Sequence, residues 1–398
     1  MKREAGEVVD IFDAIRIPGI PRVWITRGLS TEQIQSIHRN LEEFGEAENL
    51  VVSSETYRHF TVDEGRSIAV AALELFDAGA NSNEYIPHQI LTNLANVVPG
   101  SLQGLYPSLL ERDLGWGSDS MFREADWATR DRIISLLDAQ VQSIYTRQDL
   151  LCALAWIGDD VVQRQFYQWH QTPPMWRNLL YTPPEEYANA AGWELTEEGT
   201  RRNLFFEMCY DLVVPEQAPL EDTPGPVSVA IINEERCGWC GHPLTTLFDI
   251  DLRDPRMAFL PIQGKRLRIA QCLNCALQVM PHPVTDIDGD GTSRWSLYNT
   301  DPPKNLKVYD ENDTSYESLP PNQWVLGMAR RTPYENQGSH IGGCPDWVQG
   351  AEYPHCPACQ KKMMFVAQLE PNIGSLEGIF YAFVCLSCGK ATTMYQQT

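Results

Sequence analysis

The segment Cys237-Gly238-Trp239-Cys240 begins the pattern of paired cysteines that decides the fold of the second half of this 398-residue chain. Two sulfurs separated by two residues can point from one tight turn at the same metal ion, and two such turns complete the tetrahedron that zinc prefers. The spacing therefore predicts two complete four-cysteine zinc sites. Besides Cys237 and Cys240, the pairs are Cys272 and Cys275, Cys356 and Cys359, and Cys385 and Cys388.

The two halves of this cysteine-rich region resemble each other. In each half, the first pair is followed by an apolar, strand-like run and then by a second pair of the form Cys-Leu-x-Cys. This repetition predicts a duplicated zinc-ribbon unit. A four-cysteine site leaves no coordination position open for water or substrate, so we expect two structural zinc ions. Redox-active thiols are the alternative, although such thiols usually occur as one pair.

Three of the eleven cysteines lie outside this pattern. Cys152 and Cys209 fall within apolar patterns of helical spacing, which predicts buried side chains that fill the core. Cys344 follows Gly342 and Gly343 in a position compatible with exposure, but no neighbouring His or Asn marks it as a nucleophile.

The length of the chain predicts two or three domains with sizeable cores. Its first residues, Met1–Glu7, lack the apolar segment of a signal peptide, and no run of about 18 apolar residues occurs later. Cysteines that bind metal have to stay reduced. We therefore expect a cytoplasmic protein with no membrane partner.

Negative charge is concentrated in the first half of the chain. Residues 1–225 carry 17 Lys and Arg against 35 Asp and Glu, a net charge of −18, whereas residues 226–398 carry 14 against 18, a net charge of −4. A surface of this sign repels phosphate groups, so we expect no nucleic-acid partner. It attracts a basic protein and speeds the encounter. The alternative is that the acidic surface only keeps the protein soluble.

Residues 1–213 are predicted to form an acidic α-helical domain. Apolar residues recur at helical spacing from residue 30 onward, and polar turns such as Gly158-Asp159-Asp160 separate the segments. Amphipathic helices in such a series are typical of a HEAT-like solenoid, and an ordinary helical bundle is the alternative. The expected apolar faces contain Ile34, Ile37, Leu41, Phe44, Ile68, Ala71, Ala72, Leu75, Phe76, Ile86, Ile90, Leu94, Val97, Ile133, Leu137, Val141, Ile144, Leu150, Leu151, Leu154, Ile157, Val161, Val162, Phe166, Trp169, Leu204, Phe205, Met208 and Leu212.

A proline-rich interdomain linker is predicted at residues 214–227. Beyond it, residues 228–398 are predicted to form a β-rich, duplicated zinc-binding domain, because the pattern changes to the period of two that is typical of strands. Residues 286–322 are rich in Asp, Gly, Pro and Asn and are expected to form an excursion between the two zinc units. The chain as a whole is therefore predicted to be an α+β multidomain protein.

Few other sequence patterns indicate a catalytic or binding site. The alternating aspartates of residues 286–290 match the start of a calcium loop, but Leu297 stands where such a loop supplies a bidentate Glu, so a hairpin turn is preferred. The sequence contains no H-E-x-x-H, G-x-S-x-G or Walker motif, and we predict no catalytic or cofactor-binding residue. Trp127 and Trp193 stand beside acidic residues, and exposed tryptophans of this kind would serve as anchors for a protein partner.

One run of the second half resembles a known family. Residues 339–349 read Ser-His-Ile-Gly-Gly-Cys-Pro-Asp-Trp-Val-Gln, followed by Cys356-Pro-Ala-Cys359, Met-Met-Phe at residues 363–365 and Gln-Leu at residues 368–369. This resembles the Gly-Gly-x-Pro-x-Trp-x-Gln signature of the YwqG-like family of bacterial domains of unknown function. It is more distantly similar to the zinc-containing domain of the programmed-cell-death-two family, whose members are chaperones of a basic ribosomal protein. The resemblance covers residues 228–398 and implies a β-rich binding domain without known catalytic residues.

These observations support three hypotheses of function. The first is a non-enzymatic binding protein whose acidic helices hold a basic protein, as an immunity protein that neutralises a bacterial toxin; some bacterial proteins of this general type resemble such immunity proteins. The second is a chaperone or assembly factor for a basic ribosomal protein. The third is a hydrolase or redox enzyme with a site between the domains, which would need a pocket with perturbed titratable groups.

Overall fold

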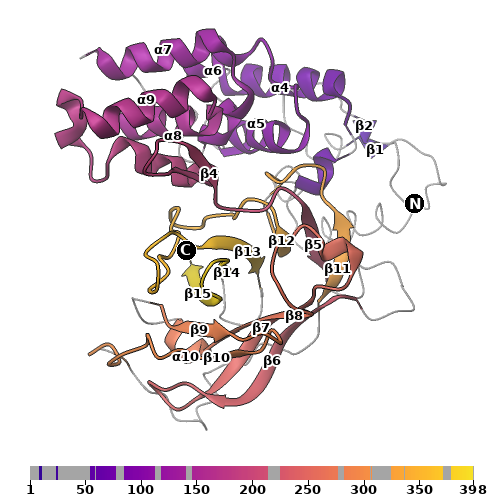
Figure 1. Cartoon of the computed structure of the whole chain (residues 1–398). Coiled ribbons are helices and arrows are strands. Elements are labelled where there is room, and N and C mark those ends of the chain that lie inside the picture. The colour runs from indigo at the N-terminus through magenta and orange to yellow at the C-terminus, as the bar shows by residue number, and fades with distance from the viewer. Residues whose placement is uncertain are drawn as a thin grey trace. The chain divides into compact units, whose positions relative to one another are not determined.

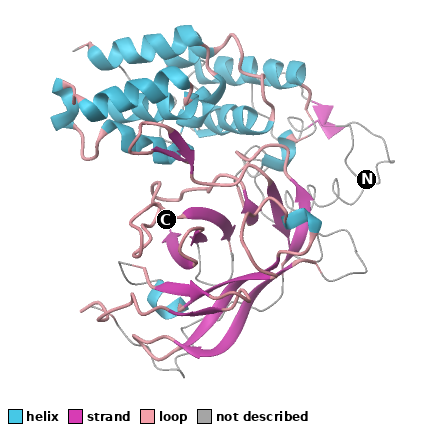
Figure 2. Cartoon of the chain, in the orientation of Figure 1, coloured by secondary structure: helices cyan, strands magenta, loops and turns pink. Residues whose placement is uncertain are grey.

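The computed structural model describes residues 9–10, 24–25, 54–58, 60–77, 85–112, 118–139, 146–213, 225–276, 282–304, 306, 324–335, 337–370 and 378–397. The chain divides into two compact units, Met1–Arg201 and Arg202–Thr398. The first is built mainly of helices and the second mainly of strands (Figure 1 and Figure 2), so the α+β fold class is confirmed.

Helices form most of the first unit. None of the described helices is both long and apolar enough to cross a membrane. Up to the short strand at its end, the elements are β1 (Val9–Asp10), β2 (Trp24–Ile25), η1 (Ser54–Tyr57), α4 (Val62–Asp77), α5 (Tyr85–Val97), α6 (Tyr106–Leu110), η2 (Ser118–Glu124), α7 (Trp127–Asp138), α8 (Arg147–Ile157), α9 (Asp160–Gln171), η3 (Met175–Leu179), η4 (Pro184–Ala191), β3 (Trp193–Leu195) and β4 (Arg201–Asn203).

The hairpin of α8 and α9 shows how local sequence sets these helices. The side chain of Thr146 caps the start of α8, and Gly158 ends it in the left-handed conformation at φ +51°, where glycine has no steric penalty. The carboxylate of Asp159 then accepts hydrogen bonds from the N–H groups of Val161 and Val162 at the start of α9. The turn predicted at residues 158–160 is therefore confirmed.

The core of the first unit contains the apolar faces expected from helical spacing. Ile90, Leu94, Ile133, Leu154 and Phe166 are buried in it. Two parts of the expected helical series, the segment with residues 34–44 and the positions 141 and 144, lie outside the described residues.

The helix expected across Leu204–Leu212 is wrong, because Cys209–Val213 forms strand β5. The apolar spacing of this segment fits a helix, but hydrogen bonding to distant strands overrides that local preference. β5 pairs with β12 (His340–Gly342) and β11 (Val325–Ala329), and the side chain of Asp211 accepts a hydrogen bond from Arg330 at 2.6 Å. The second unit accordingly begins at Arg202, ahead of the boundary expected at residue 213.

The described strands of the second unit form a larger and a smaller sheet. The larger has eight strands in the order β10-β9-β15-β14-β13-β12-β5-β11, and the smaller has the order β6-β7-β8. The elements are β5, β6 (Val227–Arg236), β7 (Pro243–Asp251), η6 (Pro255–Met257), β8 (Arg266–Gln271), α10 (Leu273–Ala276), β9 (Val284–Ile287), β10 (Ser293–Trp295), β11 (Val325–Ala329), β12 (His340–Gly342), β13 (Met364–Leu369), β14 (Gly378–Cys385) and β15 (Lys390–Gln397).

Both sheets contribute to one apolar core. Phe248 and Ile250 of β7 belong to the same buried cluster as Val366 of β13 and Phe380 of β14. Strand β10 and the last two residues of β9 fall within the excursion expected at residues 286–322, so part of that excursion is a component of the larger sheet. Of the linker predicted at residues 214–227, residues 214–224 lie outside the described residues, and β6 begins at its last position.

Candidate metal centres

The first cysteine cluster lies at one end of the smaller sheet. Cys237 and Cys240 lie in the turn between β6 and β7, and Cys272 and Cys275 lie at the short helix α10, directly after β8. The sulfur of Cys240 is 3.3 Å from that of Cys272 and 3.6 Å from that of Cys275, and the sulfurs of Cys237 and Cys275 are 3.7 Å apart.

The second cluster joins two turns of the larger sheet. Cys356 and Cys359 precede β13, in a turn closed by a β-bridge between His355 and Lys362. Cys385 and Cys388 lie in the turn between β14 and β15, and the sulfurs of Cys359 and Cys385 are 3.7 Å apart.

The geometry of both clusters suits a tetrahedral metal ion. All four sulfurs of each cluster lie within 4.8 Å of one another, and all eight cysteines are free thiols. A zinc ion with bonds of about 2.3 Å to four thiolates would place the sulfurs about 3.8 Å apart, close to the separations found here. Within the described part of the chain, these two clusters are the groups of three or more ligating side chains that could hold a metal. The structure thus brings together all eight predicted ligands.

A shared backbone turn positions the first pair of each cluster. The N–H of Cys237 donates to the carbonyl of His242 at 2.8 Å, and the N–H of Cys356 donates to the carbonyl of Lys361 at 2.9 Å. In both turns the residue after the second cysteine is left-handed, Gly241 at φ +80° and Gln360 at φ +61°. The sequence similarity of the two first pairs therefore reflects the same local structure.

The second pairs differ from each other. Cys385 and Cys388 lie in a hairpin turn that ends with left-handed Gly389 at φ +59°, whereas Cys272 directly precedes the short helix α10 and Cys275 lies in it. The two cysteine clusters are consequently alike in their first turns and different in their second turns.

Electrostatics within the clusters favours a bound cation. Hydrogen bonds from the other thiols hold the pKa of Cys240 well below its usual range, and interactions with Cys237 and Cys240 hold the pKa of Cys275 well above it. In the second cluster the N–H of Lys361 lowers the pKa of Cys359 to about 7, while burial raises that of Cys385 to about 12. A second thiolate beside the first is unfavourable without a positive charge, and a divalent metal ion would supply that charge.

Tryptophans support the first cluster. Trp239 lies between the paired cysteines, donates its indole N–H to the carbonyl of Thr300 at 2.8 Å and packs edge-on against Trp295 at 5.4 Å between ring centroids. A Cβ at position 238 would lie 2.5 Å from the indole nitrogen of Trp295, which explains the glycine there. The turn is thus shaped by its side-chain packing as well as by its cysteines.

The two clusters are connected through β9 and β15. Gln271, which precedes Cys272, accepts a hydrogen bond from the hydroxyl of Thr393 on β15. The N–H of Ile287 on β9 donates to the carbonyl of Gly389, directly after Cys388, at 2.8 Å. Strand β15 thus contacts the residue before the second pair of the first cluster, β9 contacts the residue after the second pair of the other cluster, and β9 and β15 pair with each other.

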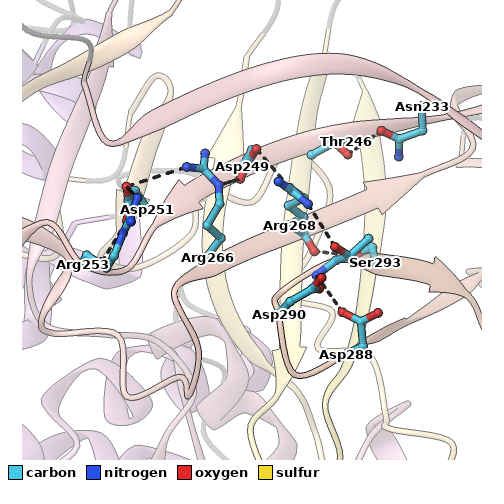
Figure 3. Close-up of polar contacts among 11 residues, drawn as sticks. Asn233, Thr246, Asp249, Asp251, Arg253, Arg266, Arg268, Asp288, Asp290 and Ser293 are labelled. Carbon is cyan, nitrogen blue, oxygen red and sulfur yellow. Dashed lines mark hydrogen bonds and ion pairs between the residues drawn. The ribbon is translucent and has the colours of Figure 1, made fainter.

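The aspartates at residues 286–290 lie in the β9–β10 hairpin, which confirms the preferred hairpin interpretation. Two of their carboxylates form ion pairs within the chain. Lys390 lies 2.7 Å from Asp286, and Arg294 lies 3.0 Å from Asp288. The surrounding polar contacts, including Asp249 between Arg266 and Arg268, continue across the smaller sheet (Figure 3).

The run at residues 339–349 has a structural role that the sequence did not reveal. Side chains from three successive strands bind its backbone: Gln368 of β13 accepts from the N–H of Asp346, Tyr381 of β14 from that of Val348, and Gln396 of β15 from that of Gln349. The ring of Trp347 stacks on Tyr381 at 4.9 Å. These contacts hold the backbone of residues 346–349 against three strands of the larger sheet.

Two titratable groups in this run are perturbed by burial. Cys344 is buried, which corrects the expectation that its position is compatible with exposure, and burial raises the pKa of its thiol. Burial also raises the pKa of the Asp346 carboxyl to about 7. Arg330 lies beside β5, with 2% of its side chain exposed, and pairs with Asp211. No sequence motif marked Asp346 or the Arg330 pair.

The remaining predicted residues have mixed outcomes. Cys209 is buried as expected, but in a strand, and Cys152 is half-buried. Trp127 is 71% exposed, as an anchor for a partner requires, and its role as an anchor stays a prediction. Trp193 is wrong as an anchor, because it is fully buried and donates its indole N–H to the carbonyl of Ala155 at 2.8 Å.

Comparisons with known proteins identify a relative. No protein-family model matches the chain, so its similarity to the YwqG-like and programmed-cell-death-two families stays a prediction. No solved structure matches it. The uncharacterized protein YpfL of Salmonella typhimurium is 34% identical over 361 residues, which cover 87% of this chain and 80% of that protein. Identity at this level over most of both chains shows that the protein belongs to the same family as YpfL.

Proposed function

We propose that the protein is a non-enzymatic binding protein whose acidic helical unit holds a basic protein partner, as an immunity protein that neutralises a bacterial toxin by direct contact. The charge distribution carries this proposal. Residues 1–201 contain 30 Asp and Glu against 16 Lys and Arg, so the helical unit has a net charge of −14. Such a surface attracts a basic protein over a distance and repels nucleic acid.

In this proposal both metal centres hold structural zinc. Four thiolates fill the tetrahedral coordination of a zinc ion and leave no position for a substrate. The ions would then stabilise the β-rich unit and take no part in a reaction. Since thiols that bind zinc must remain reduced, we expect the protein to act in the cytoplasm.

A chaperone or assembly factor for a basic ribosomal protein is the second candidate. The resemblance of residues 228–398 to the programmed-cell-death-two domain favours it, and it requires the same acidic surface. The identity of the partner distinguishes the two functions. A toxin encoded beside this gene would favour the immunity protein, and a ribosomal protein would favour the chaperone.

The test is capture of the partner by the tagged full-length chain, followed by binding measurements with the purified partner. We expect a basic protein whose association rate falls as salt is added, because screening shortens the range of attraction. Changing both exposed acids Glu197 and Glu198 to Lys should slow association without altering the metal content. An acidic partner, a nucleic acid, or a rate that does not change with salt would refute the proposal.

A further inference from the structure

The two cysteine clusters differ in how well their ligands are covered. In the first cluster three of the four cysteines are buried, and Cys240 is half-buried. The buried three belong to an apolar cluster of side chains, against which Cys240, Trp239 and Trp295 pack. This packing limits the access of solutes to the first cluster.

The second cluster is more open to solvent. Two of its cysteines, Cys359 and Cys388, are half-buried. Cys359 lies between the exposed residues Ala358 and Gln360, and Leu386 in the other turn is 43% exposed. A small solute therefore reaches the sulfurs of the second cluster more easily than those of the first.

Cysteine ligands at an accessible metal centre are open to oxidation. A metal-bound cysteine is a thiolate, which is the form that reacts with peroxides, and zinc itself has no redox chemistry. Cysteines that react in this way are typically accessible and lie beside a second sulfur that can complete a disulfide. Cys359 meets both conditions, because its sulfur lies 3.7 Å from that of Cys385. Cys240 also has a near neighbour, Cys272 at 3.3 Å, but the apolar packing covers it.

We infer that Cys359 is an oxidation site at which a peroxide converts the second zinc centre into a disulfide and releases its ion. The Cys359 thiolate attacks one oxygen of hydrogen peroxide, so the O–O bond breaks, the sulfur becomes a sulfenic acid and hydroxide leaves. The Cys385 thiolate then attacks this sulfur, forms the S–S bond and expels a second hydroxide. The two thiolates thus give two electrons to the peroxide, and two protons convert both hydroxides to water.

The disulfide removes two of the four ligands. The two thiolates that remain cannot complete a tetrahedral site, so the second centre loses its metal. The sulfurs have to close only from 3.7 Å to about 2.05 Å to form the bond. The bond joins the turn before β13 to the β14–β15 turn, as a shared metal ion would, so the release requires no unfolding of the larger sheet. This inference concerns the β-rich unit and is independent of the proposed basic partner.

The test treats the full-length, zinc-loaded chain with hydrogen peroxide while a chromogenic chelator reports free zinc. We expect one zinc ion per chain to be released at least about tenfold faster than the other, because reaction of a thiolate follows its exposure. After the fast phase, mass spectrometry of the alkylated chain, digested without reductant, should find a disulfide between Cys359 and Cys385. A dithiol reductant followed by zinc should restore the metal content, and a sample without peroxide should keep both ions.

A matched pair of variants locates the fast phase. Cys240 and Cys359 are both half-buried, and each is the second cysteine of the first pair in its cluster. Cys359→Ser should leave a single zinc ion that peroxide releases slowly, whereas Cys240→Ser should leave a single ion that is released in the fast phase. Disulfide mapping in the wild-type chain makes the same assignment without relying on the folding of either variant.

The possible outcomes distinguish this inference from the proposed function. Equal release rates for the two ions, or a fast phase that survives Cys359→Ser, would overturn it. A first disulfide between Cys240 and Cys272, or fast release without a disulfide between Cys359 and Cys385, would overturn it as well. Each of these results leaves the binding of a basic partner by the helical unit untouched.

Discussion

Unfolding of the β-rich unit should release two metal ions in one transition. The clusters are connected through two paired strands, since Gln271 before Cys272 is bonded to Thr393 of β15, and the residue after Cys388 is bonded to β9. Unfolding around one centre should therefore be accompanied by unfolding around the other. The experiment varies the free zinc concentration with a metal buffer and measures the free energy of unfolding in urea.

The expected magnitude follows from mass action. An ion that binds only the folded chain adds about 1.4 kcal/mol to the free energy of unfolding for each tenfold rise in free zinc above its Kd. Two closed sites in one cooperative unit should double this slope to about 2.7 kcal/mol. Tryptophan fluorescence follows unfolding, because Trp239 and Trp295 lie at the first cluster, and a chromogenic chelator reports zinc release at the same midpoint.

A ligand substitution provides the control. Cys359→Ser removes one sulfur of the second cluster and should reduce the slope to that of a single site, about 1.4 kcal/mol per tenfold change. Elemental analysis of the purified wild-type chain should find two zinc ions. A wild-type slope of zero, or that of one site, would refute the two-centre reasoning. Release of the two ions in separate transitions would refute the coupling through β9 and β15.

Other substitutions test single features by thermal or urea denaturation. Gln360→Gly should stabilise the chain by about 0.5–1 kcal/mol and Gly241→Ala should destabilise it by a similar amount, because both positions are left-handed; a loss for Gln360→Gly would contradict the shared turn. Gly158→Ala should cost at least about 1 kcal/mol in the helical unit, since its Cβ would lie 2.7 Å from Nη1 of Arg201 at a positive φ; circular dichroism would check it. Burial raises the pKa of Asp346 to about 7 from 3.8, so the contribution of this carboxyl to stability is greatest below pH 4 and is lost as pH rises to 7. The advantage of Asp346→Asn should therefore grow by up to about 1.4 kcal/mol per pH unit to pH 7 and stay constant above it; an advantage that is the same at pH 6 and pH 8 would contradict this.

The metal centres were predictable because their main determinants are local. Two cysteines separated by two residues share one turn whatever the rest of the fold does. Pairs that follow each other in sequence meet because antiparallel strands, β7 with β8 and β13 with β14, connect them. Glycine at positions 241 and 389 also marks left-handed turn residues in the sequence itself. The α8–α9 hairpin was predictable for the same reason, since Gly158 and Asp159 supply its stop and start signals.

Contacts between distant segments decided the rest. The spacing of residues 204–212 fits a helix, but pairing with β11 and β12 makes Cys209–Val213 a strand, because hydrogen bonds and burial in a large sheet outweigh weak local preference. Neither the burial of Trp193 nor the raised pKa of Asp346 has a local signature, since both depend on what packs around the side chain. The sequence by itself determined which cysteines form each four-cysteine cluster and where the helical hairpin turns. The tertiary structure alone decided where the helical unit ends and which acidic and aromatic side chains remain on its surface, because burial is a property of the folded packing rather than of neighbouring residues in the chain.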